Sequence, residues 1–239
     1  MIKTRHICDY CHYFIMSLTL SNAEECDVGD IADIHLASFG ENMMLQAQFP
    51  TPALRAGLRI SLMEKAREEI RDPQWAVLVV RNQNEIISFA KWMRPVLDAD
   101  SYVEVPWRWP EGTRMDILNE WARKVEDASS SVIGSTPCYC LSFIGTHPRY
   151  ERRGAATMLI QWGLERSVKE NVPIQLESTI VAWPLYKRLG FEDKKRILMQ
   201  LEGLRKDGQS VLYEELSLVC KPEVASTILN RLTHKSKTD

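Results

Sequence analysis

Hydrophobic positions along the chain form compact apolar runs in some segments and follow helical spacing in others. Residues 75–80 (WAVLVV) are a β-branched run, and a second run resumes at 85–92 (EIISFAKW) after the polar residues 82–84. Two strand-like runs separated by turn residues predict a β-hairpin. Helical spacing instead places Leu118 and Val125 on one face, so we expect a helix there.

Similar patterns recur along the chain. Asp27 suits a helix N-cap, and Thr51–Pro52 is typical of a cap followed by a first turn. The predicted strands lie at residues 18–20, 75–80, 85–92, 138–146, 173–179, 193–201 and 210–220. The predicted helices lie at residues 27–39, 53–71, from about 118 to the serines 129–131, from 155 onward, at 183–189 and within the tail 221–239. Residues 98–112 are expected to form an irregular loop.

Composition narrows the classes of function. With 45% hydrophobic and 26% charged residues among 239, the chain can bury a sizeable core and has the charge content of an ordinary soluble protein. A formal net charge of −2 provides no broad basic surface, so we expect no nucleic-acid partner. No apolar run approaches the about 20 residues of a membrane span, so we expect no membrane partner either.

The N-terminal residues do not read as an export signal. Cys8, Asp9, Cys11 and His12 interrupt the apolar stretch that such a signal needs. The six cysteines of the chain are therefore expected as reduced thiols, and the protein is expected in the cytoplasm.

The stretch from Thr146 to Thr157 has the features of an anion-binding turn. It leaves a predicted strand and turns into a predicted helix, so free backbone N–H groups point at one place, where the helix N-terminus adds a partial positive charge. Its small residues, which let a ligand approach the backbone, are Gly154, Ala155 and Ala156, and its cations are Arg152 and Arg153. A phosphate or pyrophosphate matches such a site best.

Two other phosphate motifs are missing from this turn. It lacks the Gly-Lys-Ser/Thr of a P-loop and the three glycines of a dinucleotide fingerprint. A phosphate-bearing ligand of another kind is left, and the competing interpretation is a basic helix start that is merely solvated.

Two blocks of this sequence resemble the GNAT superfamily of N-acetyltransferases. The run 141–159 is similar to its coenzyme A signature, with Gly154 and Ala156 at the last two fixed positions and Glu151 where Gln or Arg is usual. The run 184–192 (PLYKRLGFE) is similar to the family block in which a Tyr precedes Leu-Gly-Phe. Two blocks in the right order, separated by one predicted helix and one predicted strand, are more specific than either alone.

The resemblance implies a fold and a domain organisation. The fold is of the mixed α/β class, with a mostly antiparallel central sheet that splays between its fourth and fifth strands and is flanked by helices. Residues 18–220 would form the acetyltransferase domain, in which 98–137 is a family-variable insertion. Residues 1–17 would be an N-terminal extension and 221–239 a tail with a peripheral helix.

The resemblance also implies a cofactor site. Acetyl-CoA would be the co-substrate, with no metal, held between the strands at 138–146 and 173–179. The strand backbone would bond the pantetheine arm, and amides at the helix start would hold the pyrophosphate. Glu151 would point outward and contribute only its backbone, because a carboxylate repels a pyrophosphate. The implied cofactor-binding residues are Phe143, Ile144, Gly145, Thr146, Glu151, Arg152, Arg153, Gly154, Ala155, Ala156 and Thr157.

Direct transfer to an amine requires a base, an oxyanion donor and an acid for the leaving thiolate. Tyr186 is the candidate acid because it occupies the family's tyrosine position, and a core-lining aromatic is the competing interpretation. Glu177 is the candidate base, against a carboxylate that is paired or solvated. A backbone N–H near Phe143 or Ile144 is the candidate oxyanion donor. His147 is expected to be a local hydrogen-bonding residue.

Several alternatives stay open at this point. Cys138 and Cys140 alternate on a predicted buried strand, where cysteine usually acts as a small hydrophobe. The ligand-type residues Cys8 and Cys11 would make a metal-dependent arm only with a second pair, which the extension lacks. The leading function is N-acetylation of an unassigned amine, with a small molecule favoured, by a monomer or homodimer. The alternative is a catalytically weak module of the same fold that binds acyl-CoA and acts through partners.

Overall fold

The computed structural model describes residues 18–97, 102–203 and 209–235. The N-terminal extension, including Cys8 and Cys11, lies outside the described residues. The strands are β1 (Leu18–Asn22), β2 (Trp75–Asn82), β3 (Glu85–Met93), β4 (Tyr139–Thr146), β5 (Ile174–Thr179), β6 (Glu192–Leu201) and β7 (Val211–Cys220). The α-helices are α1 (Val28–Phe39), α2 (Met43–Gln48), α3 (Pro52–Arg71), α4 (Met115–Val132), α5 (Ala155–Glu170), α6 (Trp183–Arg188) and α7 (Pro222–Lys235). Two 3-10 turns are η1 (Glu25–Asp27) and η3 (Pro148–Tyr150).

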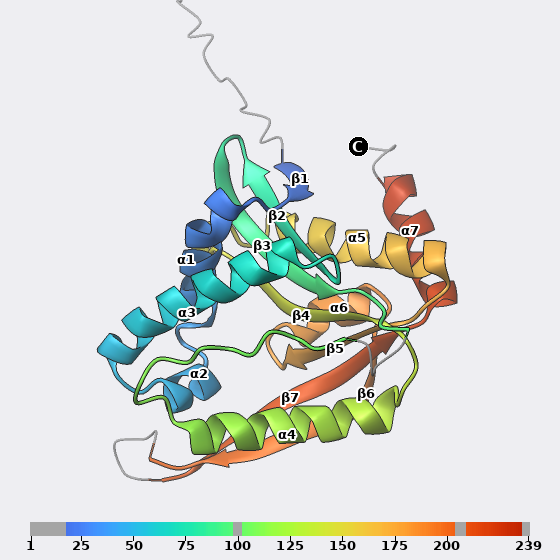
Figure 1. Cartoon of the computed structure of the whole chain (residues 1–239). Helices are drawn as coiled ribbons and strands as arrows, with labels where there is room; N and C mark the ends of the chain where they lie inside the picture. Colours follow the sequence, from blue (N-terminus) through green and yellow to red (C-terminus); the bar gives the residue numbers. More distant parts are fainter. Residues whose placement is uncertain (1–17, 98–101, 204–208, 236–239) are drawn as a thin grey trace, which may run out of the picture.

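The described strands form one seven-stranded sheet in the order β1-β2-β3-β4-β5-β7-β6 (Figure 1). All neighbouring pairs are antiparallel except β4 and β5, which are parallel. The parallel pairing covers only Tyr139–Leu141 against Ile174–Leu176, and beyond it the two strands diverge. The expected splay between the fourth and fifth strands is therefore confirmed.

Helices cover both faces of the sheet. On one face α5 packs over β2, β3 and β4, and α7 packs on α5, around a core that includes Trp92, Leu141 and Leu176. On the other face α1 and α3 lie over β2 and β3, with Val79 and Phe89 buried beneath them. The same face of β6 and β7 is covered by α2 and α4. Burial of one stripe of each helix against the sheet provides the main stabilisation of such layers.

The predicted elements lie within a few residues of the observed ones, with one exception: the short helix α2 has no counterpart in the prediction. The expected end of α4 at the serines 129–131 is met within one residue, because the helix ends at Val132. Ser131 Oγ donates to Ala128 O at 3.0 Å, which keeps its hydroxyl satisfied inside the last turn.

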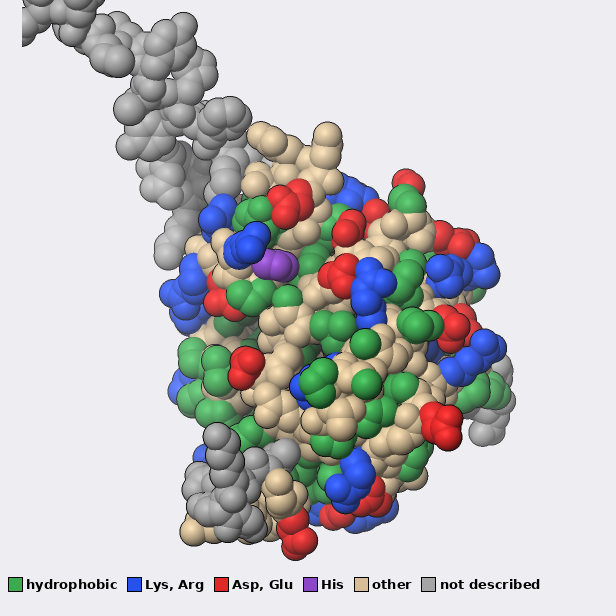
Figure 2. Space-filling model, turned by 90° about the vertical axis from the view of Figure 1, so that its left-hand side faces the viewer, with side chains coloured by type: hydrophobic (Ala, Val, Ile, Leu, Met, Phe, Trp, Pro, Cys, Tyr) green, Lys and Arg blue, Asp and Glu red, His purple; other side chains and the backbone are tan. Residues whose placement is uncertain are grey.

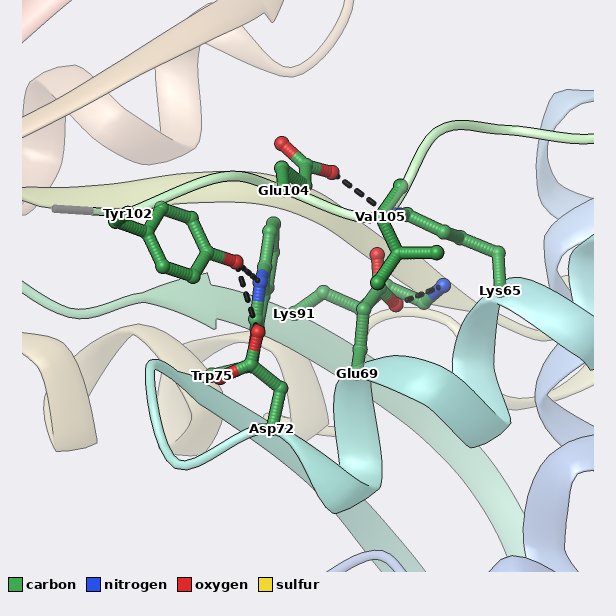
Figure 3. Close-up of polar contacts among 8 residues, drawn as sticks. All are labelled: Lys65, Glu69, Asp72, Trp75, Lys91, Tyr102, Glu104 and Val105. Atoms are coloured by element: carbon green, nitrogen blue, oxygen red, sulfur yellow. Dashed lines mark hydrogen bonds and ion pairs between the residues drawn. The ribbon is translucent and has the colours of Figure 1, made fainter. Parts of the chain in front are cut away.

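Residues 102–114 run as an irregular strap that is fastened to α3 and β2 (Figure 3). Lys65 Nζ donates to Val105 O at 2.6 Å and pairs with Glu104 at 2.7 Å. Tyr102 Oη donates to Asp72 at 2.8 Å and accepts from Trp75 Nε1 at 2.9 Å. The expected loop is thus held in place by polar contacts rather than by regular structure.

Charges of both signs are interspersed on the surface that faces left in Figure 1. Figure 2 shows that Lys and Arg lie beside Asp and Glu there, and that hydrophobic side chains gather between them. None of the helices in the described ranges is long and apolar enough to cross a membrane.

Candidate functional site

Because β4 and β5 diverge, the second half of each strand has no partner among the described strands on the edge that faces the other. Phe143–Thr146 of β4 still pairs with β3, and Glu177–Thr179 of β5 still pairs with β7. A β-bulge at Ser142 interrupts the β3–β4 register, since Leu141 lies opposite Trp92 and Phe143 opposite Lys91. A bulge turns the strand and frees backbone groups from the ladder. The opening can therefore offer N–H and C=O groups to an extended ligand.

The chain leaves β4 through η3 and enters α5 at a left-handed cap. Gly154 has φ 93° and Arg152 has φ 63°, both in the region that favours glycine, so the turn is sharp at each end. A Cβ built on Gly154 would meet no atom within 4 Å, so the space over this backbone is open. The N-terminal amides of α5 face that space without a side-chain cap. This backbone fits a phosphate group.

The charged side chains of this turn are all exposed. The guanidinium of Arg153 lies 5.0 Å from the ring centroid of Tyr150 and donates to Arg149 O at 3.1 Å, which holds the cation beside the turn. Tyr150 Oη donates to Glu85 Oε2 at 2.5 Å, which fastens the turn to the start of β3. Glu151 is exposed in this turn.

The last residues of β4 are fixed from both neighbouring elements. Ser88 Oγ donates to Gly145 O at 2.8 Å, and Ser38 Oγ of α1 donates to Thr146 O at 2.9 Å. A Cβ on Gly145 would lie 2.8 Å from the ring of Phe89, so only glycine fits this contact. The strand edge at the splay is therefore held rigidly before any ligand arrives.

Phe143 lies where the bulge meets the α1–α3 face. Its ring is 5.0 Å from that of His35 and 6.2 Å from that of Trp107, centroid to centroid. Phe143 is partly buried, and His35 is fully buried, so burial lowers the pKa of His35 to about 3 and keeps it neutral. His147, in contrast, accepts from Arg149 N at 3.3 Å through Nδ1, which is the local role expected for it.

Tyr186 is 3% exposed and belongs to the core under α5 and α6. Its ring lies 5.5 Å from that of Phe191 in an edge-on arrangement. Burial raises the pKa of the Tyr186 phenol, and the carboxylate of Glu215 raises it further. The phenol therefore keeps its proton at neutral pH, and the raised pKa makes it a weaker acid than a solvent-exposed tyrosine.

Glu177 is the first residue of β5 beyond the last pair with β4. Its Oε1 accepts from Gln175 Nε2 and from Ser217 Oγ, both at 3.3 Å. Burial raises the pKa of this carboxyl, and the two hydrogen bonds partly offset the effect. Glu177 is thus partly buried and hydrogen-bonded to Gln175 and Ser217, and no arginine of the described residues pairs with it.

Two thiols share this face of the sheet. Cys138 Sγ and Cys140 Sγ lie 3.4 Å apart beside Gln175, and the charge of Glu177 acts on both. They remain free thiols, together with Cys26 and Cys220, in the described part of the chain. Within the same residues, no group of three or more His, Cys, Asp or Glu side chains could hold a metal ion.

Sequence reasoning missed a polar cluster on β7. Tyr213 Oη donates to Glu215 Oε1 and accepts from Asn42 Nδ2 at 2.9 Å. Burial raises the pKa of Glu215 to about 7, and the charge of Glu177 adds to the increase. The only signal in the sequence is the polar run Tyr213–Glu215 within an apolar strand, and it does not show which residue faces inward.

A family model described as the acetyltransferase (GNAT) family matches residues 44–191, which contain the splay, the anion-binding turn and Tyr186. The chain belongs to the GNAT acetyltransferase family. Members of this family use acetyl-CoA, and both blocks predicted from the sequence fall within the matched range except for the last residue of the second block. The turn that fits a phosphate lies within the matched range.

Solved structures share the GNAT fold at low sequence identity. The C-terminal condensation domain of Ebony, in complex with beta-alanyl-dopamine, has a TM-score of 0.64 at 14% identity over 87% of this chain and 100% of that one. A mosquito arylalkylamine N-acetyltransferase like 5b has a TM-score of 0.57 at 16% identity over 86% of this chain and 100% of that one. The PaiA N-acetyltransferase of Thermoplasma acidophilum, in complex with coenzyme A, has a TM-score of 0.51 at 11% identity over 86% of this chain and 99% of that one. No curated protein sequence matches the chain.

Proposed function

We propose that this GNAT protein is an acetyl-CoA-dependent N-acetyltransferase that passes the acetyl group directly to an amine. The observation that carries the proposal is the β4–β5 splay, which opens next to the uncapped N-terminus of α5. A strand edge and a helix N-terminus at one opening fit the two ends of a pantetheine diphosphate. The acceptor is an amine of a small molecule.

The cofactor would be held mainly by backbone. Residues 143–146 would bond the pantetheine arm along the free edge of β4, and residues 151–157 would hold the diphosphate at the start of α5. Arg152 and Arg153 are exposed beside these amides and add positive charge. Thr157 lies in the first turn of α5, where its hydroxyl can add a further donor.

The chain's own residues would then guide the proton transfers. A backbone N–H freed by the bulge at Ser142 would stabilise the oxyanion near Phe143 or Ile144. Tyr186 would donate a proton to the departing thiolate of coenzyme A. Glu177, at the start of the divergence, is one carboxylate that could take the proton of the amine. The free thiols of the described residues suit a reducing compartment, and we place the protein in the cytoplasm.

Calorimetric titration with acetyl-CoA tests the cofactor site. Arg153→Glu is expected to weaken binding by about tenfold or more, roughly 1.4 kcal/mol, since it reverses a charge beside the diphosphate. Arg123→Glu is the matched control, because Arg123 is exposed and pairs with Asp127 on α4, away from the α5 turn. Absence of binding to the wild-type protein would contradict the proposal. Binding without release of coenzyme A in the presence of amines would favour a binding module.

A further inference from the structure

Glu215 lies beside the splay although it is distant from the GNAT blocks in sequence. On β7 it stands opposite Thr179, beside the half of β5 that has left β4. Glu177 is the first residue of that half and stands opposite Ser217. Glu215 shares its face of β7 with Tyr213, which packs among residues of α2, α4 and β6. This face is the one on which the bulged Phe143 of β4 also lies, opposite Lys91.

The carboxylate of Glu215 is positioned by a chain of hydrogen bonds. Tyr213 donates its phenolic proton to Glu215, and Asn42, the N-cap of α2, donates to the same phenolic oxygen at 2.9 Å. Asn42 is fixed in turn, because its Oδ1 accepts from Met44 N at 2.8 Å. The ring of Trp121 packs edge-on against Tyr213 at 5.1 Å. Glu215 itself is only partly buried, whereas Tyr213 is buried.

The other ionisable groups around Glu215 do not neutralise it. Glu177 on β5 is a second acid, and Tyr186 on α6 is a phenol whose pKa the Glu215 charge raises. On β6, Lys195 is bonded to Ser131 Oγ of α4 at 2.8 Å. On α4, Lys124 pairs with Glu120 of the same helix. On α2, the buried residues are Met44, Leu45 and Ala47.

We propose that Glu215 is the residue that takes the proton from the acceptor amine in this reaction, with Tyr213 as its positioning residue. The inference rests on the proposed N-acetyltransferase function. The amine nitrogen forms the new bond to the acetyl carbonyl carbon, the carbon–sulfur bond breaks, and the nitrogen proton passes to Glu215. Tyr186 gives its proton to the coenzyme A thiolate and regains one from solvent, while Glu215 releases the amine proton to solvent. The net products are the acetamide and coenzyme A.

Geometry favours Glu215 over Glu177 for this role. Oε1 of Glu177 already accepts two hydrogen bonds, from Gln175 and Ser217, within the sheet. Glu215 receives its hydrogen bond from Tyr213 and lies close enough to Tyr186 for its charge to act on the phenol. Its pKa of about 7 also suits a base that must be ionised yet able to hold a proton near neutral pH.

The test compares the wild-type protein with Glu215→Gln, Glu177→Gln, Tyr213→Phe and Glu214→Gln. Glu214 is the matched control, because it neighbours Glu215 in the strand and pairs instead with Arg196 at 2.7 Å. Coenzyme A release is measured with acetyl-CoA and three probe amines, namely 2-phenylethylamine, spermidine and a lysine-containing peptide. Acetyl-CoA affinity is measured separately by calorimetry.

Glu215→Gln is expected to lower kcat about 100-fold, to remove the inflection near pH 7 from the kcat profile, and to leave acetyl-CoA affinity within about twofold. Tyr213→Phe removes a hydrogen bond that lowers the pKa of Glu215, so its inflection should move to higher pH. Glu214→Gln should match the wild type.

Two results would overturn the role of Glu215 alone: a Glu215→Gln rate within about threefold of Glu214→Gln, or a loss of the inflection in Glu177→Gln instead. A wild-type protein that fails to bind acetyl-CoA, or binds it without transfer to any probe amine, would overturn the proposed function and the role of Glu215 together.

Discussion

Lys91 Nζ lies 2.6 Å from Glu69 Oε2, and the two side chains are only 1% and 3% exposed. The pair joins β3 to α3 beneath the strap (Figure 3). The rings of Trp107 and Phe143 lie 5.7 and 5.9 Å from the ammonium. Burial lowers the pKa of Lys91 and raises that of Glu69, while each charge opposes the shift of the other. The ion pair therefore packs against Phe143, the residue that follows the bulge of β4.

Removing one partner of this pair should lower the stability of the folded protein. Glu69→Ala leaves a buried ammonium without its counter-charge, and the free energy of unfolding should fall by about 3–5 kcal/mol. Urea denaturation at pH 7 measures the loss. The exposed pair of Arg123 and Asp127 is the control, and Asp127→Ala should change stability by less than about 1 kcal/mol. Equal effects in the two variants would show that the Lys91 charge is not buried in solution.

The phenol of Tyr186 should matter for transfer and little for binding. Tyr186→Phe keeps the ring in its contact with Phe191 and removes only the proton donor. We expect kcat to fall about 10- to 100-fold while acetyl-CoA affinity stays within about twofold. Tyr139→Phe is a suitable control, since its hydroxyl donates to Glu170 at 2.8 Å. A Tyr186→Phe enzyme with the kcat of Tyr139→Phe would restrict Tyr186 to packing.

Glu151 should weaken the cofactor site of the natural protein. Its carboxylate is exposed within the turn that would hold the diphosphate, where like charge is repulsive. Glu151→Gln supplies the residue type common in the GNAT signature and should tighten acetyl-CoA binding about threefold at low salt. The gain should shrink as ionic strength rises, because exposed charges are screened. Calorimetry at two salt concentrations decides the point, and an equal gain at both would exclude a charge effect.

The sequence was enough to predict the order of the strands and of all the helices except α2, because local patterns determine them. Thr51 caps α3 as expected, with Oγ1 accepting from Leu54 N, and the hairpin of β2 and β3 follows from the apolar runs and the polar residues between them. The anion-binding turn was also predictable, since strand, glycine and helix start are adjacent in the chain.

The β7 cluster was not predictable, because its contacts are formed across the fold. Asn42 and Tyr213 are 171 residues apart, and the helix that carries Asn42 at its cap is too short to show a period. The alternation along β7 shows two faces, but only the complete sheet determines which face contains Glu215. Glu177 was selected for its strand, and its hydrogen bonds to Gln175 and Ser217 depend on the register with β7.

The stability of the folded protein should depend on pH through Glu215. Its pKa is raised from 4.5 to about 7 in the folded state, so between these values the folded protein binds more protons than the unfolded chain. The penalty is absent below about pH 4.5 and grows as pH rises, reaching on the order of 3 kcal/mol above pH 7. Glu215→Gln removes the penalty, and should therefore be stabilising relative to the wild type at pH 8 and close to neutral at pH 5. Urea denaturation at the two pH values measures the difference, with Glu214→Gln as control. A Glu215→Gln effect that is the same at both pH values would show that this carboxyl titrates normally, and would leave the amine without a base of suitable pKa on β7.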